Sequence, residues 1–432
     1  MTAHERPSPR TAWSVVAILY VCYACNMADR HILSILGQDV KLEFQLTDGE
    51  LGLLTGPAIA LLYAALGIPL AYLADRVRRV RFLAASLLLW SCFTALGGLA
   101  ANAWQLALSR IGVSAAEAGG TPASASILAD YFPPERRAFP MAVFASASTA
   151  GIFLSFTLGG LVAHHYGWRI ALISGGVPGV LLSLVVLLCI AERKRGILDG
   201  PIPAEAASRP RSIPGTVAHI LGIAVYRRTL IAAAALNIAI ATTLSWSPTF
   251  VMRKFGLTAA DVGSSLGIGI AVIGGVCIIF AGVVTERVGK AGVARSLRMV
   301  GALQASGLVF LIVALTTSSA LLAAICFSLL YGVMHFYVPV YYVVANNHVP
   351  VAMRATTVAV GVLGMTLLGQ GLAPPVIGFL SDLLRSSFGD SSLGLAMAPA
   401  GLLILFSACQ FFRAAKAGAA AEGAGLAGAP AK

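Results

Sequence analysis

Charged side chains are scarce in this sequence. Asp, Glu, Lys and Arg make up only 11% of the 432 residues, while hydrophobic residue types make up 58%. A water-soluble protein needs about a quarter of its residues charged to cover its surface. The composition therefore excludes a soluble globular protein and indicates an integral membrane protein.

Motifs for enzymatic or metal chemistry are also lacking. The polar segments contain no nucleotide-binding P-loop and no H-E-x-x-H motif. All seven cysteines fall in apolar segments, so the C-x-x-C pair Cys22 and Cys25 is expected to pack in a helix, without redox or metal chemistry. His164 and His165 are adjacent on one helix and point apart. We expect no enzyme activity, no metal site and no cofactor.

Long apolar runs, by contrast, fill most of the chain. A run of roughly 20 apolar residues can cross the hydrocarbon core as a helix. The sequence predicts twelve such helices, six before and six after a polar segment at 191–215 that carries charges and prolines. They are expected at 12–36, 51–73, 80–100, 103–128, 138–163, 168–190, 228–250, 262–284, 297–316, 320–345, 353–380 and 394–412.

These runs predict an all-α integral membrane protein with 12 transmembrane helices in two six-helix bundles. The N-terminal bundle is expected at 1–190 and the C-terminal bundle at 228–413, joined by a cytoplasmic linker at 191–227. The Ala/Gly-rich tail at 414–432 is expected to be disordered.

Basic residues are distributed unevenly among the predicted loops. With the N-terminus in the cytoplasm, the cytoplasmic segments hold 23 Lys and Arg residues and the outer loops hold 5, while Arg30 and Arg110 lie within helices. Positive charge gathers in the cytoplasmic loops of membrane proteins. We expect a multi-pass protein of the inner (plasma) membrane with both termini in the cytoplasm. Topology thus explains the formal charge of +12, and no nucleic-acid partner is needed.

The two halves share a loop motif. "AYLADRVRR" (71–79) follows the second predicted helix, and "GVVTERVGK" (282–290) follows the eighth. Duplicated six-helix bundles are the architecture of secondary transporters, which rock two halves about a central site. An acid at this place can cap a neighbouring helix and pair with a nearby arginine. We predict a conformational lock, with a plain topogenic cluster as the alternative; its residues are Asp75, Arg76, Arg79, Glu286 and Arg287.

These features resemble the major facilitator superfamily. In its loop motif, G-x-x-x-D-R-x-G-R-R, the acid and two arginines of 71–80 match, whereas Ala71, Arg78 and Val80 depart from it. The segments 52–76, 109–138, 167–169 and 354–382, with the Asp-Arg pair of the first helix, are similar to the Spinster branch of that superfamily.

The resemblance implies two pseudo-symmetric bundles, the major facilitator fold, and export of lysolipids or sphingoid lipids, as in eukaryotic Spinster proteins. Anion–cation symporters share several of these features. Drug/proton antiporters carry a Gly-Pro pair in the fifth helix, and the lack of that pair here disfavours them.

Four ionisable residues lie inside the predicted helices: Asp29, Arg30, Arg110 and Glu117. A charge at the membrane centre costs about 2.5–3.5 kcal/mol on insertion scales, so such residues face the bundle interior or water. A spacing of seven puts Arg110 and Glu117 on one helical face, while Asp29 and Arg30 point about 100° apart. We expect a buried network of zero net charge. The resemblance implies that its two helices, the first and fourth, line the cavity; the alternative is a network that only stabilises the bundle.

The network suggests a coupling mechanism, with Glu117 and Asp29 as the proton-coupling residues. If an anionic headgroup binds Arg30 or Arg110, Glu117 loses its partner and takes up a proton, which leaves when the headgroup leaves. His335, mid-helix in the tenth span, has packing as its alternative role. The predicted substrate-binding residues are Arg30, Arg110, Asn26, Thr121, His335, Tyr337, Tyr341 and Gln370.

An ionic N-terminal half opposite an apolar, aromatic C-terminal half suits an amphiphile. We expect a proton-coupled, alternating-access transporter of a lipid-like substrate such as a lysophospholipid or sphingoid lipid. Its partners would be this small molecule, protons and membrane lipids, and the protein would act as a monomer. A proton-coupled symporter of small organic anions is the alternative, because it would use the same cationic site.

Overall fold

The structure is a computed structural model of the full chain. It describes residues 7–427 except 57–65, 67–69, 71–75, 134–135, 195–196, 199–212, 290–291 and 348–353. All regular elements in the described residues are helices, as the sequence predicts. Eight of the described helical segments are long and apolar enough to cross a membrane.

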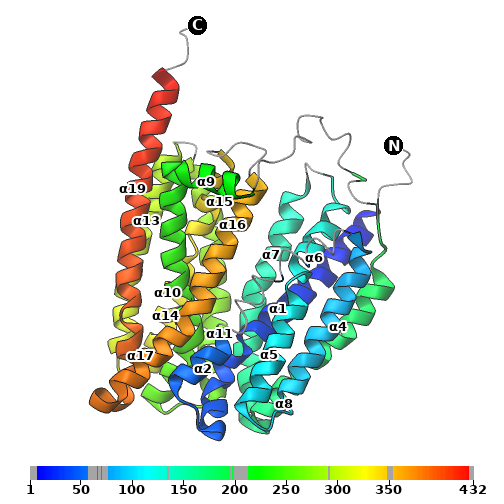
Figure 1. The fold of residues 1–432 in the computed structure, drawn as a ribbon, viewed down its shortest axis with the longest axis vertical. Coiled ribbons are helices and arrows are strands. Elements are labelled where there is room, and N and C mark those ends of the chain that lie inside the picture. Colours follow the sequence, from blue (N-terminus) through cyan, green and yellow to red (C-terminus); the bar gives the residue numbers. More distant parts are fainter. Residues whose placement is uncertain are drawn as a thin grey trace. The chain divides into compact units, whose positions relative to one another are not determined.

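The chain folds into two compact helical units (Figure 1). Unit 1 comprises Met1–Ile202 and Pro248–Ala271, and unit 2 comprises Pro203–Ser247 and Val272–Lys432. Two helical elements contribute to both units. They are α10 (Ala224–Phe255) and the π-helix η5 (Ile270–Gly274).

Unit 1 is built around α1 (Pro9–Phe44), which packs on α7 and α8, while α4 packs on α5 and α8. Its other elements are α2 (Asp48–Thr55), α4 (Arg79–Gly97), α5 (Ala103–Glu117), α6 (Gly120–Ala129), α7 (Ala138–Phe153), the π-helix η3 (Leu154–Gly159), α8 (Gly160–Cys189) and α11 (Ala259–Gly269).

Local signals set several helix boundaries in unit 1. The Ser8 hydroxyl caps α1 by accepting from the Thr11 amide, and Pro9 occupies the first turn, where no amide donor is needed. Asn102 caps α5 in the same way, by accepting from the amide of Gln105. Within α8, Gly167 has φ 83° and ψ 161°, a conformation that glycine adopts readily. This residue is the kink that separates the predicted fifth and sixth spans.

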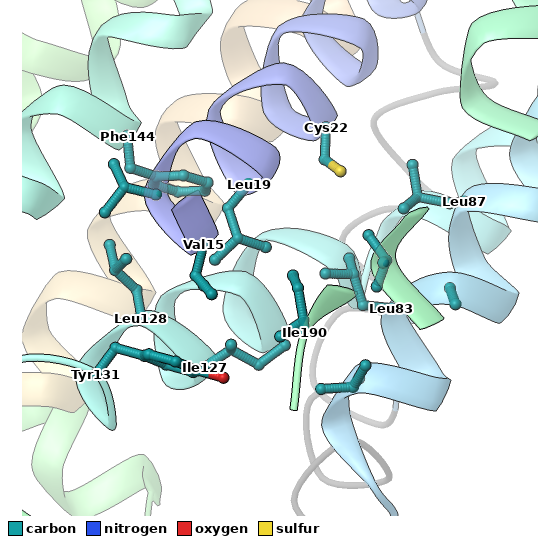
Figure 2. Packing of buried hydrophobic residues seen from close by; sticks show 14 of the residues in the cluster. Val15, Leu19, Cys22, Leu83, Leu87, Ile127, Leu128, Tyr131, Phe144 and Ile190 are labelled. Carbon is teal, nitrogen blue, oxygen red and sulfur yellow. The ribbon is translucent and has the colours of Figure 1, made fainter. Parts of the chain in front are cut away.

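A hydrophobic core fills the space between these helices. Buried side chains from α1, α4, α6 and α7 meet there (Figure 2). Close packing of these side chains holds the helices of unit 1 together and thereby positions the polar residues further along α1. The residues labelled in the view are Val15, Leu19, Cys22, Leu83, Leu87, Ile127, Leu128, Tyr131, Phe144 and Ile190.

In unit 2, α13 packs against α14 and α19. Beside the shared α10 and η5, the unit contains α9 (Ile213–Gly222), α12 (Gly275–Gly289), α13 (Val293–Thr316), α14 (Ala320–Met334), α15 (Tyr337–Asn347), α16 (Arg354–Thr366), the π-helix η7 (Leu367–Leu372), α17 (Ala373–Phe388), the 3₁₀ helix η8 (Gly389–Ser391), α18 (Ser392–Met397) and α19 (Ala400–Ala427).

Several element boundaries differ from the predicted ones. Helix α9 lies inside the segment predicted as a linker, and α19 continues to Ala427 through the tail expected to be disordered. The tail is rich in alanine, the residue with the highest helix propensity, which explains its helical state. The predicted span 103–128 is divided into α5 and α6, and 320–345 is divided into α14 and α15. Most of the predicted span 51–73 lies outside the described residues.

Candidate functional site

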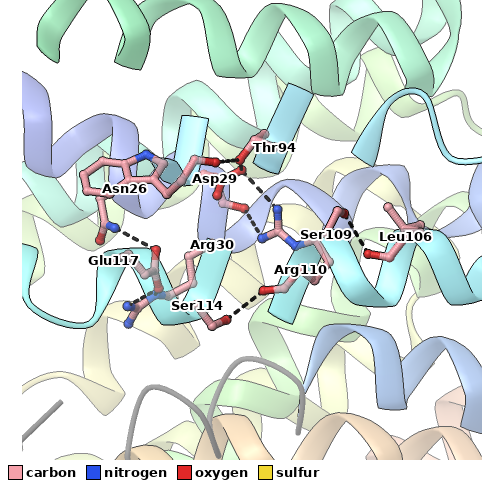
Figure 3. A network of polar contacts seen from close by, with 10 residues as sticks. Asn26, Asp29, Arg30, Thr94, Leu106, Ser109, Arg110, Ser114 and Glu117 are labelled. Carbon is pink, nitrogen blue, oxygen red and sulfur yellow. Dashed lines mark hydrogen bonds and ion pairs between the residues drawn. The ribbon is translucent and has the colours of Figure 1, made fainter. Parts of the chain in front are cut away.

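The four ionisable residues of the predicted network meet in unit 1 (Figure 3). Asp29 and Arg30 come from α1, and Arg110 and Glu117 come from α5. Arg110 Nη1 lies 3.1 Å from Asp29 Oδ1, and Arg30 Nη2 lies 2.6 Å from Glu117 Oε1. The residues thus form two ion pairs between the same two helices. As predicted, the neighbours Asp29 and Arg30 have different partners.

Further hydrogen bonds fix both carboxylates. Thr94 of α4 donates to Asp29 Oδ1 over 2.8 Å, and Arg110 Nη2 donates to the Asp29 carbonyl oxygen over 2.9 Å. Asn26 Nδ2 donates to Glu117 Oε2 over 2.7 Å. Asn26 and Arg30 are four residues apart on α1, so they lie on the same face of the helix. Both side chains donate hydrogen bonds to the carboxylate of Glu117.

The network is buried but not fully satisfied. Arg110 and Glu117 are each only 1% exposed. Three of its buried atoms have no hydrogen-bond partner among the described residues: Asn26 Oδ1, Asp29 Oδ2 and Arg110 Nε. Buried polar atoms are normally paired, so these atoms are free to bind water, a proton or a polar group of a substrate.

Thr121 does not join the network. It lines a small adjacent cavity of about 10 Å³, together with Cys22, Asn26 and Trp90. That volume is about the size of one water molecule. Asn26 therefore connects the network to a space large enough for one water molecule, and Thr121 lines the same space.

In unit 2, the predicted residues Tyr337 and Tyr341 line a pocket of about 130 Å³. Asn237 Nδ2 donates to Tyr337 Oη over 2.8 Å, which ties α10 to α15. Sequence reasoning did not select the other pocket residues for binding. They come from α10, α15 and α16, and are Asn237, Val338, Tyr342, Val362, Met365 and Thr366.

Gln370 lies in the π-helix η7, and its buried Oε1 has no partner among the described residues. The neighbouring Gly369 packs directly on the Asn237 backbone, so η7 adjoins the helix that carries the pocket's amide. Short π-helices of this kind frequently occur at functional sites. Gln370 itself does not line the pocket.

The prediction that His335 lies in the middle of a helix is wrong. His335 is the residue at which α14 ends, and its Nδ1 lies 2.8 Å from the Tyr331 carbonyl oxygen. Pro339 explains the break, because a proline ring clashes with the carbonyl four residues earlier and cannot donate to it. The contact is local and His335 does not line the tyrosine pocket.

Arg79, one of the predicted lock residues, makes extensive contacts. Its buried guanidinium pairs with Asp130 at 2.5 Å and Glu192 at 3.3 Å, and it donates to the Ser126 hydroxyl and to the Arg193 carbonyl oxygen. Arg79 therefore joins the start of α4 to the ends of α6 and α8. Sequence reasoning missed Asp130 and Glu192, although both acids directly follow apolar segments.

The other lock residues contribute less to this picture. Asp75 lies outside the described residues, and Arg76 is exposed. Glu286 and Arg287 are exposed on α12, and neither forms an ion pair with a described residue. Beside the Arg79 cluster, Tyr131 donates to the Ala191 carbonyl oxygen over 2.8 Å, and burial raises the pKa of this phenol.

Comparison with known proteins decides the family. Residues 19–374 match the family model of the Major Facilitator Superfamily. The chain belongs to this superfamily. It is therefore a multi-pass membrane transporter and not an enzyme, and the family fold implies twelve membrane helices.

Relatives match this transporter over nearly its whole length. An MFS-type efflux pump of Mycolicibacterium smegmatis is 30% identical over 94% of this chain and 92% of its own. A sphingosine-1-phosphate transporter of Danio rerio is 26% identical over 94% of this chain and 84% of its own. The match to the sphingosine-1-phosphate transporter agrees with the Spinster branch predicted from the sequence motifs.

A solved structure supports the fold. It is a bacterial homolog of the human lysosomal transporter Spinster in an inward-facing, unoccupied conformation. It superimposes with a TM-score of 0.83 at 24% identity, covering 96% of this chain and 99% of the other. The predicted major facilitator fold is thereby confirmed.

Proposed function

We propose that this protein is a proton-coupled transporter of an amphipathic, lipid-like substrate with an anionic headgroup. The observation that carries the proposal is the Arg30–Glu117 ion pair, buried beside unpaired polar atoms of Asn26 and Arg110. A buried arginine is suited to bind phosphate or carboxylate groups, and a buried glutamate is suited to bind a proton.

The observed ion pairs suggest which arginine takes part in the proposed coupling step. Arg30, rather than Arg110, is the ion-pair partner of Glu117. A headgroup that accepts the hydrogen bonds of Arg30 removes the counter-ion of Glu117, and desolvation then favours the neutral, protonated carboxyl. When the headgroup leaves, Arg30 pairs with Glu117 again and the proton is released. Asp29 is the second acid that can take this role, because its Oδ2 has no hydrogen-bond partner in the described structure.

The tyrosine pocket of unit 2 supports the lipid-like part of the substrate. It is lined by aromatic rings, aliphatic groups and a thioether, with hydroxyl and amide groups but no ionised side chain. Such a lining suits the neutral, mostly apolar body of an amphiphile. The Danio rerio relative transports a phosphorylated sphingoid lipid by its name. We extend to this chain the class of substrate, an anionic headgroup on an apolar tail.

We also propose its setting in the cell. The excess of Lys and Arg in one set of loops supports an inner-membrane transporter with both termini in the cytoplasm. It would act as a monomer, because each chain carries its own pair of units.

Flux in liposomes tests the function. The protein is reconstituted, labelled lysophospholipid is supplied, and a proton gradient is imposed across the bilayer. Glu117→Gln keeps the size and an acceptor oxygen for Asn26 but removes the titrating group. Glu50→Gln is the matched control, because Glu50 is exposed and glutamine also completes the capping box of α2.

The expected result is gradient-driven flux in the parent and in Glu50→Gln, and flux without a response to the gradient in Glu117→Gln. A full response in Glu117→Gln would move the coupling role to Asp29. No lysophospholipid flux in the parent, with flux of small organic anions, would replace the lipid by the alternative substrate class.

A further inference from the structure

Three aromatic rings meet at one end of unit 1. Trp13 lies near the start of α1, Phe132 follows the end of α6, and Phe139 lies in the first turn of α7. The Trp13 ring packs edge-on against both others, with ring centroids 5.8 Å from Phe132 and 5.7 Å from Phe139. Arg137 Nε donates to the Phe132 carbonyl oxygen over 2.8 Å and so fixes the chain between the two phenylalanines. We call Trp13, Phe132 and Phe139 the aromatic cluster.

The described residues leave most of the aromatic cluster uncovered. Phe132 is buried, whereas Trp13 is 41% exposed and Phe139 is 67% exposed. The indoles of Trp168 and Trp246 donate hydrogen bonds, but the indole Nε1 of Trp13 donates none to a described residue. Rings with an apolar body and a free polar donor gather at the membrane–water boundary, where they contact acyl chains and headgroups together. The aromatic cluster therefore suits the edge of a bilayer.

Two exposed arginines flank the aromatic cluster. Arg10 lies three positions before Trp13 on α1, and Arg136 lies three positions before Phe139. Residues three apart on a helix are neighbours on its surface, so the Arg10 guanidinium can reach the edge of the indole. Neither Arg10 nor Arg136 has a side-chain hydrogen bond or ion pair with a described residue. Both guanidinium groups are therefore available to a ligand outside the described protein.

The charge around the aromatic cluster favours an anionic ligand. The segments 1–14 and 133–139 together hold four arginines and two glutamates, an excess of two positive charges. Each arginine near a membrane surface strengthens the attraction to anionic lipids about fivefold. A phosphate group can accept hydrogen bonds from guanidinium groups and from an indole N–H at the same time. An anionic phospholipid supplies both this phosphate and an acyl chain for the exposed rings.

We propose that the aromatic cluster, together with Arg10 and Arg136, is a binding site for an anionic phospholipid of the surrounding bilayer. The headgroup phosphate would accept hydrogen bonds from both arginines and from Trp13 Nε1, and an acyl chain would lie against the Phe139 ring. This lipid is a partner of unit 1 and not the transported substrate, because none of these residues belongs to the buried ion-pair network or to the tyrosine pocket. The site does not depend on the function proposed above.

Quenching of tryptophan fluorescence by brominated lipids tests the site. The full-length protein is placed in phosphatidylcholine nanodiscs that contain a rising share of either brominated phosphatidylglycerol or brominated phosphatidylcholine. Bromine on an acyl chain quenches the tryptophans that it touches. The signal of Trp13 is the difference between the parent and Trp13→Phe, which keeps an aromatic ring. Trp104 is the control residue, measured through Trp104→Phe, because it is 69% exposed at the start of α5 and has no charged residue within five positions.

Trp13 should be quenched at a share of phosphatidylglycerol about fivefold or more below the share of phosphatidylcholine that gives the same loss. Trp104 should respond equally to the two lipids. The double variant Arg10→Gln with Arg136→Gln should remove the preference at Trp13 and leave its quenching by phosphatidylcholine unchanged. Removing two exposed arginines of unit 2, by Arg385→Gln with Arg413→Gln, should leave the preference intact.

Three results would overturn the proposal. Equal quenching of Trp13 by the two lipids in the parent would show no anionic selectivity, and no quenching by either would show that the aromatic cluster does not contact the bilayer. A preference that persists without Arg10 and Arg136, or that falls equally in the unit 2 double variant, would mean that these two arginines do not form the site. No substrate is present, so these outcomes are independent of the flux experiment.

Discussion

The two units differ in what they bury. In the described residues, every buried side chain that carries a formal charge lies in unit 1, whereas the buried polar side chains of unit 2 are neutral. The buried charged residues are Asp29, Lys41, Asp48, Arg79, Arg110, Glu117 and Asp130. Each of them forms an ion pair within unit 1.

Several buried polar side chains of unit 2 form neutral hydrogen bonds instead. Thr242 and Ser328 donate to carbonyl oxygens four residues earlier, and Trp246 Nε1 donates to the Pro374 carbonyl oxygen over 3.1 Å. Such bonds satisfy the hydroxyl and indole donors without creating sites for ions. A buried charge is costly and responds to protons and anions, whereas a neutral hydrogen bond does not. The comparison therefore supports the proposal that protons and anionic groups bind in unit 1 and that the neutral part of the substrate binds in unit 2.

The largest effect is expected from breaking an ion pair in unit 1. Arg110→Met leaves the carboxylate of Asp29 buried without its cation, which should lower the free energy of unfolding by about 3–5 kcal/mol. Chemical or thermal unfolding in detergent measures the loss. The double variant Asp29→Asn with Arg110→Met removes both charges and should recover most of it. A double variant as unstable as the single one would contradict the ion-pair account.

A smaller effect is expected from the corresponding change in unit 2. Asn237→Ala removes the amide that donates to Tyr337 Oη, and an unpaired buried polar group costs about 1–3 kcal/mol. The same unfolding measurement applies, with Tyr337→Phe as the matched change on the other side of the bond. Adding Tyr337→Phe to Asn237→Ala should cost little more, because the bond is already lost. Strictly additive losses would show that the two side chains are not coupled.

Much of this contrast was predictable from the sequence. Runs of apolar residues predicted the helices, and the few charges inside them predicted where a network would form. The spacing of seven between Arg110 and Glu117 and the adjacency of Asp29 and Arg30 were enough to predict their orientations on two helices. These inferences succeeded because helical periodicity relates residues that are close in sequence.

The remaining features depend on contacts between distant residues. Glu192 binds Arg79 across 113 positions, and Arg253 binds Asp48 across 205. No periodicity relates such residues, so the partners of Arg79 and the Arg253–Asp48 ion pair were missed. The π-helix η7 and the break at His335 also arise from packing and from Pro339, which an apolar run of the right length conceals.

The smallest effect is expected where a charge pair in unit 1 is exposed. Glu43 pairs with Arg169, but these side chains are 44% and 35% exposed, and the carboxylate also accepts from Trp168 Nε1 over 2.6 Å. Glu43→Gln retains an acceptor for Trp168 and removes only the charge. Water already solvates such a pair, so the free energy of unfolding should change by less than about 1 kcal/mol.

Salt distinguishes the exposed pair from the buried ones. The small effect of Glu43→Gln should fade between low and high ionic strength, because exposed charges are screened. The loss in Arg110→Met should persist, because Asp29 is shielded from the solvent. Unfolding curves of both variants at two salt concentrations make the comparison. A loss in Glu43→Gln as large and as salt-resistant as that in Arg110→Met would mean that burial is not what separates the two kinds of charge.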